Sequence, residues 1–340
     1  PRHIPPKRGR VMHAPGFWSH SDPGILSRVL WPASLIWSGL SALRQRYATP
    51  TEMNIPVYCI GNVTLGGAGK TPVALDLAQR LIGQGAQPHF LSRGYGGSAA
   101  GPLRVDPTQH GAAQVGDEPL LLARIAPTWI GADRVASAHM AQKAGATHLI
   151  MDDGFQNPGL HKTASLLVVD GAVGFGNGFV FPAGPLREPV AAALARTNAV
   201  LILGDQAAPH LKRDLSGFHG PILSVHIVAD RPKALPIGTK CIAFAGIGRP
   251  EKFFATLRGL DLDLLLTQEF PDHHPFSAQD MTALEKQATM LGGVLVTTEK
   301  DAIRLPAAFR SQVISVPITL DWPPSVDPLS LLTQGRADVV

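Results

Sequence analysis

The sequence predicts an α/β protein with a mostly parallel sheet that helices cover on both faces. Apolar segments of strand length alternate with helical segments between residues 56 and 230, polar clusters follow several of these strands, and a second, shorter alternation begins near Lys240. In such chains each crossover helix returns the backbone to the same edge of the sheet, so ligands bind beside the carboxyl ends of the strands. The expected strands are 57–60, 89–91, 128–130, 148–151, 166–169, 199–203 and 222–227, and the expected helices are 72–84, 117–126, 134–144 and 189–196.

Residues 57–73 indicate what the first sheet binds. A run of strand formers leads into a glycine-rich turn, and a Lys-Thr pair then opens a helix. Glycines let backbone N–H groups converge on phosphate oxygens, and the helix N-terminus adds the positive end of its dipole. Strand, turn, Lys-Thr and helix together predict the phosphate-binding loop of a P-loop NTPase-like domain. The residues expected to bind nucleotide are Thr64, Leu65, Gly66, Gly67, Ala68, Gly69, Lys70 and Thr71.

Lys70 and Thr71 have separate expected tasks in this loop. Lys70 would reach the β- and γ-phosphates of ATP, and the Thr71 hydroxyl would hold Mg²⁺. The usual first glycine, five positions before Gly69, is Thr64 here, so the glycines at 66 and 67 would have to make the tight turn. A glycine-rich turn that binds nothing is the alternative, and the strand before the loop and the helix after it argue against that alternative.

Composition places the chain among ordinary globular proteins long enough for two domains. Of 340 residues, 45% are hydrophobic and 16% are charged. The net charge of +4 is diffuse, with one short basic block at 7–10, so nucleic acid is not an expected partner. Cys59 and Cys241 lie in apolar, strand-like runs, which predicts buried free thiols in a reducing compartment, without a disulfide framework or a metal cluster.

The N-terminal segments differ from the rest of the chain. Residues 1–15 are rich in proline, arginine and histidine and are expected to be disordered. Residues 16–47 carry a broad apolar surface flanked by arginines, and Pro32 is expected to start a second helical segment or to kink a single one. Charges and serines interrupt this surface, so neither a membrane-spanning helix nor a cleaved signal peptide is expected. Its composition suits an amphipathic helix lying on a membrane, but its periodicity suits a helix facing a protein core equally well.

Three polar clusters follow expected strands of the first domain, at the edge where ligands bind. Arg93 lies among glycines and would project into the site. Asp117 and Glu118 begin a helix, and capping of that helix is the favoured interpretation of such an isolated pair. Asp152 and Asp153 end an apolar strand, the expected position of an Mg²⁺-supporting carboxylate, and a plain turn after the strand is the alternative.

The long loop 174–189 has little periodicity, and such loops in compact domains usually carry function. Its only charged residues, Arg187 and Glu188, are therefore candidates for contact with an anionic or sugar substrate.

A second, smaller α/β/α domain is expected over residues 231–340, after a first domain over 48–230. The loop 270–276 of this second domain carries the adjacent histidines His273 and His274. A metal site there is not expected, since no partner ligands follow at a recognisable spacing, and an acid/base, an orienting and a structural role all stay open. The expected strands of this domain are 241–245, 294–296 and 313–316, and its expected helices lie around 253–257 and at 277–291.

Taken together, these segments resemble the tetraacyldisaccharide 4′-kinase (lipid A 4′-kinase) family of Gram-negative bacteria. The matching segments run in order from about residue 17 to 320, and the ordered set is far more specific than the phosphate-binding loop alone. They are 61–72, 92–97, 115–119, 152–156, 181–189, 244–250, 270–274 and 297–301. The resemblance implies phosphorylation by ATP, with Mg²⁺, of the 4′-hydroxyl of a lipid-linked glucosamine disaccharide 1-phosphate.

The resemblance also implies two α/β/α domains that close over nucleotide, and peripheral attachment to the cytoplasmic face of the inner membrane, which favours the membrane interpretation of residues 16–47. It implies that Asp117 is the general base and that His273, from the other domain, is its partner. The phosphate and Mg²⁺ contacts that it implies come from Lys70, Thr71, Glu118, Asp152 and Asp153. The expected substrate contacts are Asn62, Arg93, Gln156, Arg187 and Glu188.

The chain departs from the family pattern after Gln156. Relatives usually continue with His and then Arg-Asp, whereas Asn157 and Lys162-Thr163 stand here, and we expect a peripheral change in loop contacts. Two other functions are conceivable. A membrane-associated P-loop switch or partitioning ATPase would carry lysine at the position of Leu65, which counts against it. A soluble kinase of a small sugar would use residues 16–47 only as core.

Overall fold

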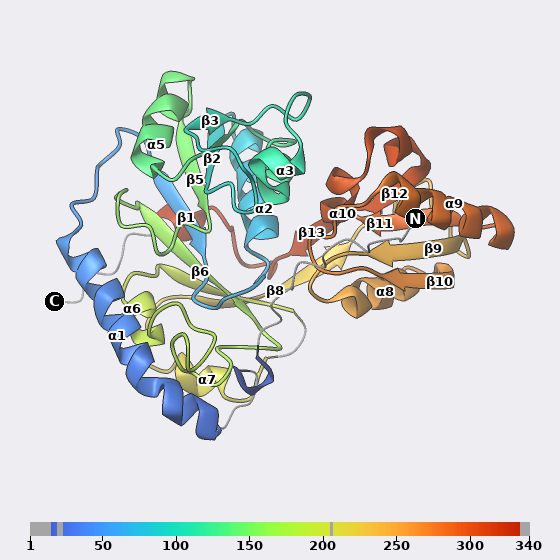
Figure 1. Ribbon diagram of the computed structural model, residues 1–340. Helices are drawn as coiled ribbons and strands as arrows, with labels where there is room; N and C mark the ends of the chain where they lie inside the picture. The colour runs from blue at the N-terminus through green and yellow to red at the C-terminus, as the bar shows by residue number, and fades with distance from the viewer. Residues whose placement is uncertain (1–14, 19–22, 205–206, 334–340) are drawn as a thin grey trace, which may run out of the picture.

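Nine strands form the larger sheet, in the order β13-β8-β7-β6-β1-β5-β2-β4-β3 (Figure 1). The computed structural model describes residues 15–18, 23–204 and 207–333, so the disorder expected for 1–15 falls almost entirely outside the described residues. The edge strands β3 and β13 are antiparallel to their neighbours, and the other strands run parallel. The strands are β1 Val57–Gly61, β2 Pro88–Ser92, β3 Leu103–Arg104, β4 Thr128–Ile130, β5 His148–Asp152, β6 Ala164–Asp170, β7 Ala199–Leu203, β8 Ile222–Ala229 and β13 Ile318–Asp321.

Helices cover both faces of this sheet, which is why its central strands are apolar throughout. On β1, Tyr58 and Ile60 enter one hydrophobic core, while Val57 and Cys59 enter the core on the opposite face. Helix α2 packs on the first face, and α5, α6 and α7 contribute to the second. The helices of the larger unit are α1 Ile25–Tyr47, α2 Lys70–Gly83, α3 Ala112–Val115, α4 Asp117–Leu122, α5 Arg134–Lys143, α6 Val190–Leu194, α7 Leu211–Asp214 and α11 Ser330–Thr333, with a 3₁₀ turn at Gly16–Trp18.

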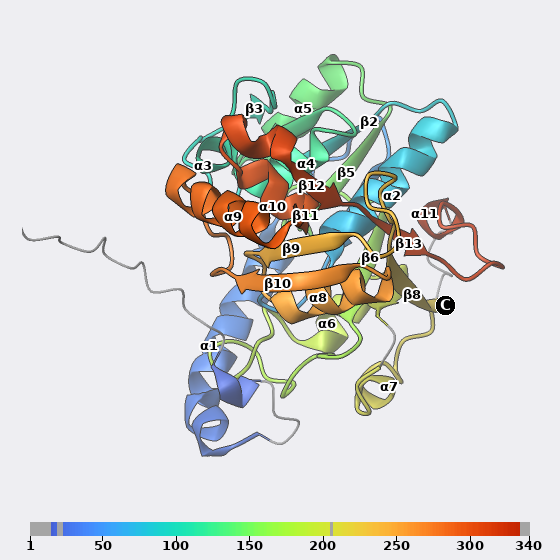
Figure 2. The same ribbon diagram turned by 90° about the vertical axis from the view of Figure 1, so that its right-hand side faces the viewer.

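A four-stranded parallel sheet in the order β10-β9-β11-β12 forms the smaller unit, beside the larger one (Figures 1 and 2). Both predicted α/β units are therefore present. The strands are β9 Lys240–Ala245, β10 Asp263–Glu269, β11 Val294–Thr298 and β12 Val313–Val316. The helices are α8 Pro250–Gly259, α9 Ala278–Leu291 and α10 Glu299–Arg304, with a 3₁₀ helix at Ala307–Gln312. The cysteines predicted to be buried and free are both so.

The last described residues return to the larger unit. Residues 318–333, expected in the smaller domain, pack instead on the nine-stranded sheet, because β13 pairs with β8 and Trp322 is buried in the core beneath α2. The Trp322 indole also donates a hydrogen bond from Nε1 to Asp76 Oδ2 of α2 at 3.0 Å. The chain thus crosses between the two units twice, which limits how they can move relative to each other.

Helix α1 lies along the outside of the larger unit, away from the smaller one (Figure 1). It is a single helix of 23 residues with Pro32 inside it. Among the described residues, no helix combines the length and the apolar character that crossing a bilayer requires.

Candidate active site

The phosphate-binding loop joins the end of β1 to the start of α2, as the glycine spacing predicts. Gly69 has a φ of 80°, which lets the backbone turn into the first residue of α2. A side-chain carbon added at Gly66 or Gly67 would meet no atom within 4 Å, so the loop borders open space where phosphate oxygens can approach. The long loop 174–189 supports the phosphate-binding loop, because Leu65 N donates a hydrogen bond to Pro185 O at 2.7 Å.

Lys70 lies beneath this loop with little exposed surface. Its Nζ donates to Asn62 Oδ1 at 3.1 Å and lies 3.5 Å from Asp153 Oδ1. Asn62 is buried and also donates to the backbone of Thr64 at 3.0 Å. Asn62, predicted to contact substrate, therefore orients the lysine and the loop. These acceptors hold the ammonium at the position from which it can reach phosphate.

Asp152 and Asp153 point in different directions, although the sequence predicts a common metal role. Thr71 Oγ1 donates to Asp152 Oδ2 at 2.9 Å. Asp153 has a φ of 58° and turns toward Lys70 and Arg187, whose Nη1 lies 2.8 Å from its Oδ1. Burial would raise the pKa of Asp153, but the charges of Lys70 and Arg187 outweigh it and lower that pKa. Asp153 is therefore an ion-pair partner, and Asp152 faces the threonine.

Asp152 has the chemistry of a cation ligand. Its Oδ1 is buried and has no hydrogen-bond partner among the described residues. Burial and the nearby charge of Glu118 raise the pKa of its carboxyl to about 7. Glu118 itself lies 3.5 Å from Lys300 of α10. In the described part of the chain no three His, Cys, Asp or Glu side chains gather closely enough to hold a metal alone, so a cation here would need phosphate or water oxygens as well.

The loop 174–189 reaches the site through Arg187. Arg187 Nη1 contacts Gln156 Oε1 at 3.1 Å, and its Nε is buried without a partner among the described residues. Gln156 Nε2 in turn donates to Glu188 Oε1 at 3.1 Å. Glu188 is buried and paired with Arg196 at 2.8 Å. Arg187 is thus placed for contact with an anion, whereas the Glu188 carboxylate is engaged in bracing Gln156.

Asp117 and His273 come together from the two units. His273 Nδ1 lies 2.9 Å from Asp117 Oδ2, although the residues are 156 positions apart. Burial would raise the pKa of Asp117, but the hydrogen bond from His273 and the charges of Lys300 and Arg304 lower that pKa to about 2. His273 has a φ of 58°, a left-handed conformation that is uncommon for residues with a side chain and that often marks functional sites.

Two arginines add positive charge at the same edge of the sheet. Arg93 follows β2 and is exposed. Arg134, which the sequence interpretation missed, is 5% exposed at the start of α5. Burial and the charge of Arg93 lower the pKa of Arg134 to about 10, while Asp153 opposes that shift. Arg134 lies four residues beyond β4, so the rule that polar residues after strands form the site could have identified it.

Comparison with known proteins decides the family. The sequence model of the family described as "Tetraacyldisaccharide-1-P 4'-kinase" matches residues 26–333. The chain belongs to this kinase family. The tetraacyldisaccharide 4'-kinase of Rhodospirillum centenum is 50% identical over 335 residues, covering 96% of this chain and 98% of the relative. That of Gluconacetobacter diazotrophicus is 50% identical over 324 residues, covering 94% and 97%. The resemblance predicted from the motifs is confirmed, and the switch ATPase and small-sugar kinase are not favoured.

A solved structure supports the fold. The crystal structure of LpxK from Aquifex aeolicus in complex with ATP matches with a TM-score of 0.71 and 23% identity, covering 91% of this chain and 99% of that one. The α/β fold class predicted for this member of the tetraacyldisaccharide 4'-kinase family is therefore confirmed.

Two of the residues that depart from the family pattern, Asn157 and Lys162, contact each other in the structure. Lys162 Nζ donates a hydrogen bond to the Asn157 carbonyl oxygen.

The positive φ of Gly69 gives a stability prediction. In Gly69→Ala, the new Cβ would lie 2.5 Å from Leu203 Cδ1 on a backbone that disfavours side chains. We expect the free energy of unfolding without nucleotide to fall by about 1–3 kcal/mol, measured by thermal or urea unfolding. The control is Gly83→Ala at the other end of α2, where the added carbon meets no atom within 4 Å. Equal stability of the two variants would contradict the geometry assigned to the loop.

Proposed function

We propose that this chain transfers the γ-phosphoryl group of ATP to the 4′-hydroxyl of a tetraacyldisaccharide 1-phosphate, a step of lipid A biosynthesis. Family membership supports the reaction. The observation that carries the proposal is the contact between Asp117 and His273 across the two units, at the same edge of the sheet as Lys70, Thr71 and Asp152. A phosphate-holding loop and a proton-accepting pair are the two parts that phosphoryl transfer to an alcohol needs.

The loop and α2 position the phosphates. Backbone N–H groups around Gly66 and Gly67 and the N-terminus of α2 favour negative charge there, and Lys70 adds a full positive charge. Thr71 and Asp152 are the residues that would hold Mg²⁺, which when bound neutralises charge on the phosphate oxygens. The buried, unpartnered Oδ1 of Asp152 supports this assignment. Asp153 and Gln156 hold Arg187 in place. From there its guanidinium would stabilise the negative charge that develops on the transferred group, or would bind an anionic group of the acceptor.

The geometry supports assigning the proton-accepting step to His273 and orientation of the imidazole to Asp117, the reverse of the assignment by resemblance. A carboxylate with a pKa of about 2 is a weak base. With Nδ1–H donating to Asp117, the His273 lone pair lies on Nε2, where it can accept a proton from the 4′-hydroxyl. The Asp117 charge then stabilises the imidazolium that forms. In catalytic triads too, a histidine accepts the proton, and a carboxylate orients the imidazole and stabilises its charged form.

Ion pairs hold the smaller unit against the larger one around the site. Lys300 pairs with Glu118 at 3.5 Å, and Arg249 pairs with Asp170 at the end of β6. These contacts favour a closed arrangement in which His273 reaches Asp117. Closure would limit access of water to the γ-phosphate and so favour transfer to the lipid over hydrolysis.

Helix α1 docks the enzyme on the cytoplasmic face of the inner membrane, where its substrate would lie. The side chains that α1 buries are serines: Ser34 Oγ donates to Val180 O at 2.7 Å, and Ser27 Oγ accepts from Asn177 Nδ2 at 3.0 Å. The apolar side chains face outward instead, which is the reverse of a core-facing helix. Such a contiguous exposed surface is typical of membrane contact. Those at least 47% exposed are Ile25, Leu26, Val29, Trp31, Leu35, Ile36, Trp37, Leu40, Leu43 and Tyr47.

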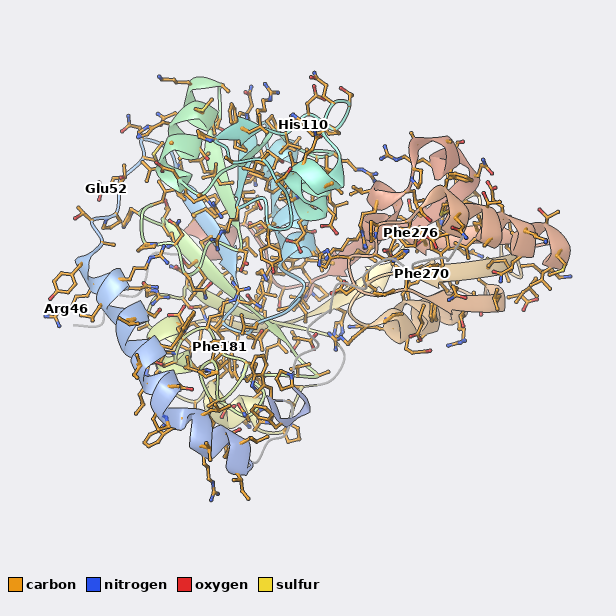
Figure 3. All side chains as sticks on the ribbon, in the orientation of Figure 1. Arg46, Glu52, His110, Phe181, Phe270 and Phe276 are labelled. Carbon is orange, nitrogen blue, oxygen red and sulfur yellow. The ribbon has the colours of Figure 1, made fainter. Side chains whose placement is uncertain are left out.

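The same helix touches the loop that carries Arg187. Trp37 Nε1 donates to the Arg187 carbonyl oxygen at 3.3 Å, and its ring meets Phe181 edge-on at 5.2 Å. Figure 3 shows Phe181 beside α1. A lipid whose acyl chains stay in the bilayer beside α1 would therefore find Arg187 close to the membrane surface.

Charge on the exposed face of α1 is expected to weaken vesicle binding. In a variant carrying Ile36→Glu and Leu40→Glu, two exposed apolar side chains become charged. We expect binding to anionic phospholipid vesicles to fall at least about tenfold in a sedimentation assay, with the thermal unfolding temperature retained. Met290→Glu, at an even more exposed apolar position on α9 of the smaller unit, is the control. Vesicle binding unchanged by the α1 substitutions would refute docking through this face.

Incubation with γ-labelled ATP and the lipid-linked disaccharide monophosphate tests the function. We expect label to appear on the lipid and to require both substrates. Release of labelled inorganic phosphate with or without the lipid, and none on the lipid itself, would instead indicate an ATPase.

A further inference from the structure

Arg304, the last residue of α10, is hydrogen-bonded to the backbone of two segments that meet at His273. Its Nη2 donates to Gly246 O at 3.0 Å, and its Nη1 donates to His274 O at 3.1 Å. Gly246 O accepts a second hydrogen bond from His273 N at 3.0 Å. One guanidinium therefore joins the end of β9 to the loop that carries the histidine. This loop needs such support, because His273 holds a left-handed backbone conformation.

The same guanidinium also faces the carboxylate that His273 contacts. Arg304 Nε lies 3.4 Å from Asp117 Oδ2, the oxygen that His273 Nδ1 approaches at 2.9 Å. The Arg304 side chain is 4% exposed, so water screens this interaction little. Arg304 thus contacts both the loop of the histidine in the smaller unit and the aspartate in the larger unit.

Asp301 fixes the guanidinium in place. Its Oδ1 accepts from Arg304 Nη2 at 2.6 Å and from Gly246 N at 3.1 Å, while its Oδ2 accepts from Thr298 Oγ1 at 2.7 Å. The Asp301 side chain is fully buried. The ring of Phe276 lies 5.8 Å from the guanidinium carbon and closes another side of the group. These four oxygen partners need four N–H donors in a rigid plane, which arginine supplies and lysine, with three rotating donors, does not.

We propose that Arg304 is a positioning residue of the transfer reaction. It holds the His273 imidazole and the Asp117 carboxylate at hydrogen-bonding distance when the two units meet. The inference rests on the proposed function, since it assigns a task within that site. Arg304 touches neither nucleotide nor acceptor in this assignment. It acts through the left-handed loop at His273 and through the orientation of the Asp117 carboxylate. Its replacement should therefore lower the rate of the chemical step and leave nucleotide binding intact.

Arg304→Lys keeps the positive charge and removes the planar guanidinium with its fixed hydrogen-bond donors. We expect kcat to fall about 10- to 100-fold, because a displacement of catalytic groups by about 1 Å has an effect of that size, while the KM for ATP changes less than about threefold. When Arg304→Lys is added to His273→Ala, kcat should fall by less than about a further twofold, because the effects of residues that act as one unit do not add. The control is Arg310→Lys: Arg310 also donates to two backbone carbonyl oxygens, those of Leu305 and Ile303, but at the surface.

Three kinetic results would overturn the inference: a kcat of Arg304→Lys equal to that of wild type, an equal loss in Arg310→Lys, or full multiplication of the two losses in the double variant. If Arg304→Lys does not fold, Asp301→Asn repeats the test, because it keeps the shape of Asp301 and weakens its hold on the guanidinium. The ring ¹⁵N signals of His273, expected to shift in either variant, report positioning without turnover. A wild-type enzyme that labels no lipid would defeat the proposed function, whereas an active wild type with unchanged His273 signals in the variants would defeat this inference alone.

Discussion

His273→Ala is expected to lower kcat for lipid phosphorylation by about 10²- to 10⁴-fold, the usual contribution of a general base. The imidazole is the group that can accept the hydroxyl proton, and it contributes nothing to the loop that holds ATP. Binding of magnesium nucleotide, measured by calorimetry, should therefore stay within a few-fold of wild type. Asp117→Ala should lose most turnover as well and also keep ATP binding.

The two single variants and their combination distinguish the roles. If His273 accepts the proton and Asp117 orients it, the double variant should be scarcely slower than His273→Ala, because the two residues act as one unit. If Asp117 were the base, Asp117→Ala would lose nearly all turnover and His273→Ala only a small part. His274→Ala is the control for the loop, since His274 pairs with Asp280 at 3.1 Å and not with Asp117.

Asp152→Asn is expected to change turnover and stability in opposite directions. Loss of the carboxylate beside Thr71 should lower kcat by about 10²- to 10³-fold, since charge stabilisation of the phosphates is weakened. Without nucleotide, however, the variant should be more stable at pH 8 by on the order of 2 kcal/mol. The reason is that burial and Glu118 raise the pKa of Asp152 to about 7, so at pH 8 the folded protein carries a buried charge that asparagine removes.

The contribution of Asp152 to the free energy of unfolding depends on pH. Between about pH 4 and 7 the folded state keeps a proton on Asp152 that the unfolded state has released, so this group's contribution to stability falls as the pH rises through that range. Urea unfolding of wild type and Asp152→Asn at pH 5.5 and pH 8 measures the difference.

Asp153→Asn is the matched control for Asp152→Asn. The pKa of Asp153 is lowered by Lys70 and Arg187 against the effect of burial, so its stabilising contribution is present above the unfolded pKa and is lost as the pH falls. Asp153→Asn should therefore lower stability at pH 8. Stability changes of the same sign in the two neighbouring variants would contradict the separate tasks assigned to them.

Strand positions in the larger sheet follow from local apolar runs. β4 and β7 have the predicted bounds, and β1, β2, β5, β6 and β8 extend the predicted runs by one to three residues. The two-residue edge strand β3 was not predicted. Strand β10 was not predicted, because it is a half-exposed edge strand whose leucines suit a helix as well. Strand β13 was not assigned to the larger sheet, because its four residues give no signal of a return across the molecule. Pairing with a distant strand depends on tertiary packing, which local propensity does not encode.

The site was predictable in its residue types and less so in their tasks. Lys70, Thr71 and Asp152 follow from spacing and from their positions after strands, whereas the role of Asp117 came from the family resemblance. The separate directions of Asp152 and Asp153 depend on the left-handed backbone at Asp153, which no pattern marks. Arg304 lies on a helix of the other unit, and nothing in the sequence near it indicates a contact with Asp117.

Phosphorus NMR of the lipid product decides whether the enzyme transfers phosphate to the 4′-hydroxyl. After incubation with magnesium ATP, we expect a second phosphomonoester signal on the disaccharide beside that of the 1-phosphate, absent when Lys70→Met replaces wild type. A pyrophosphate signal, which would mean transfer to the existing phosphate, or free inorganic phosphate with an unchanged lipid would contradict transfer to the 4′-hydroxyl.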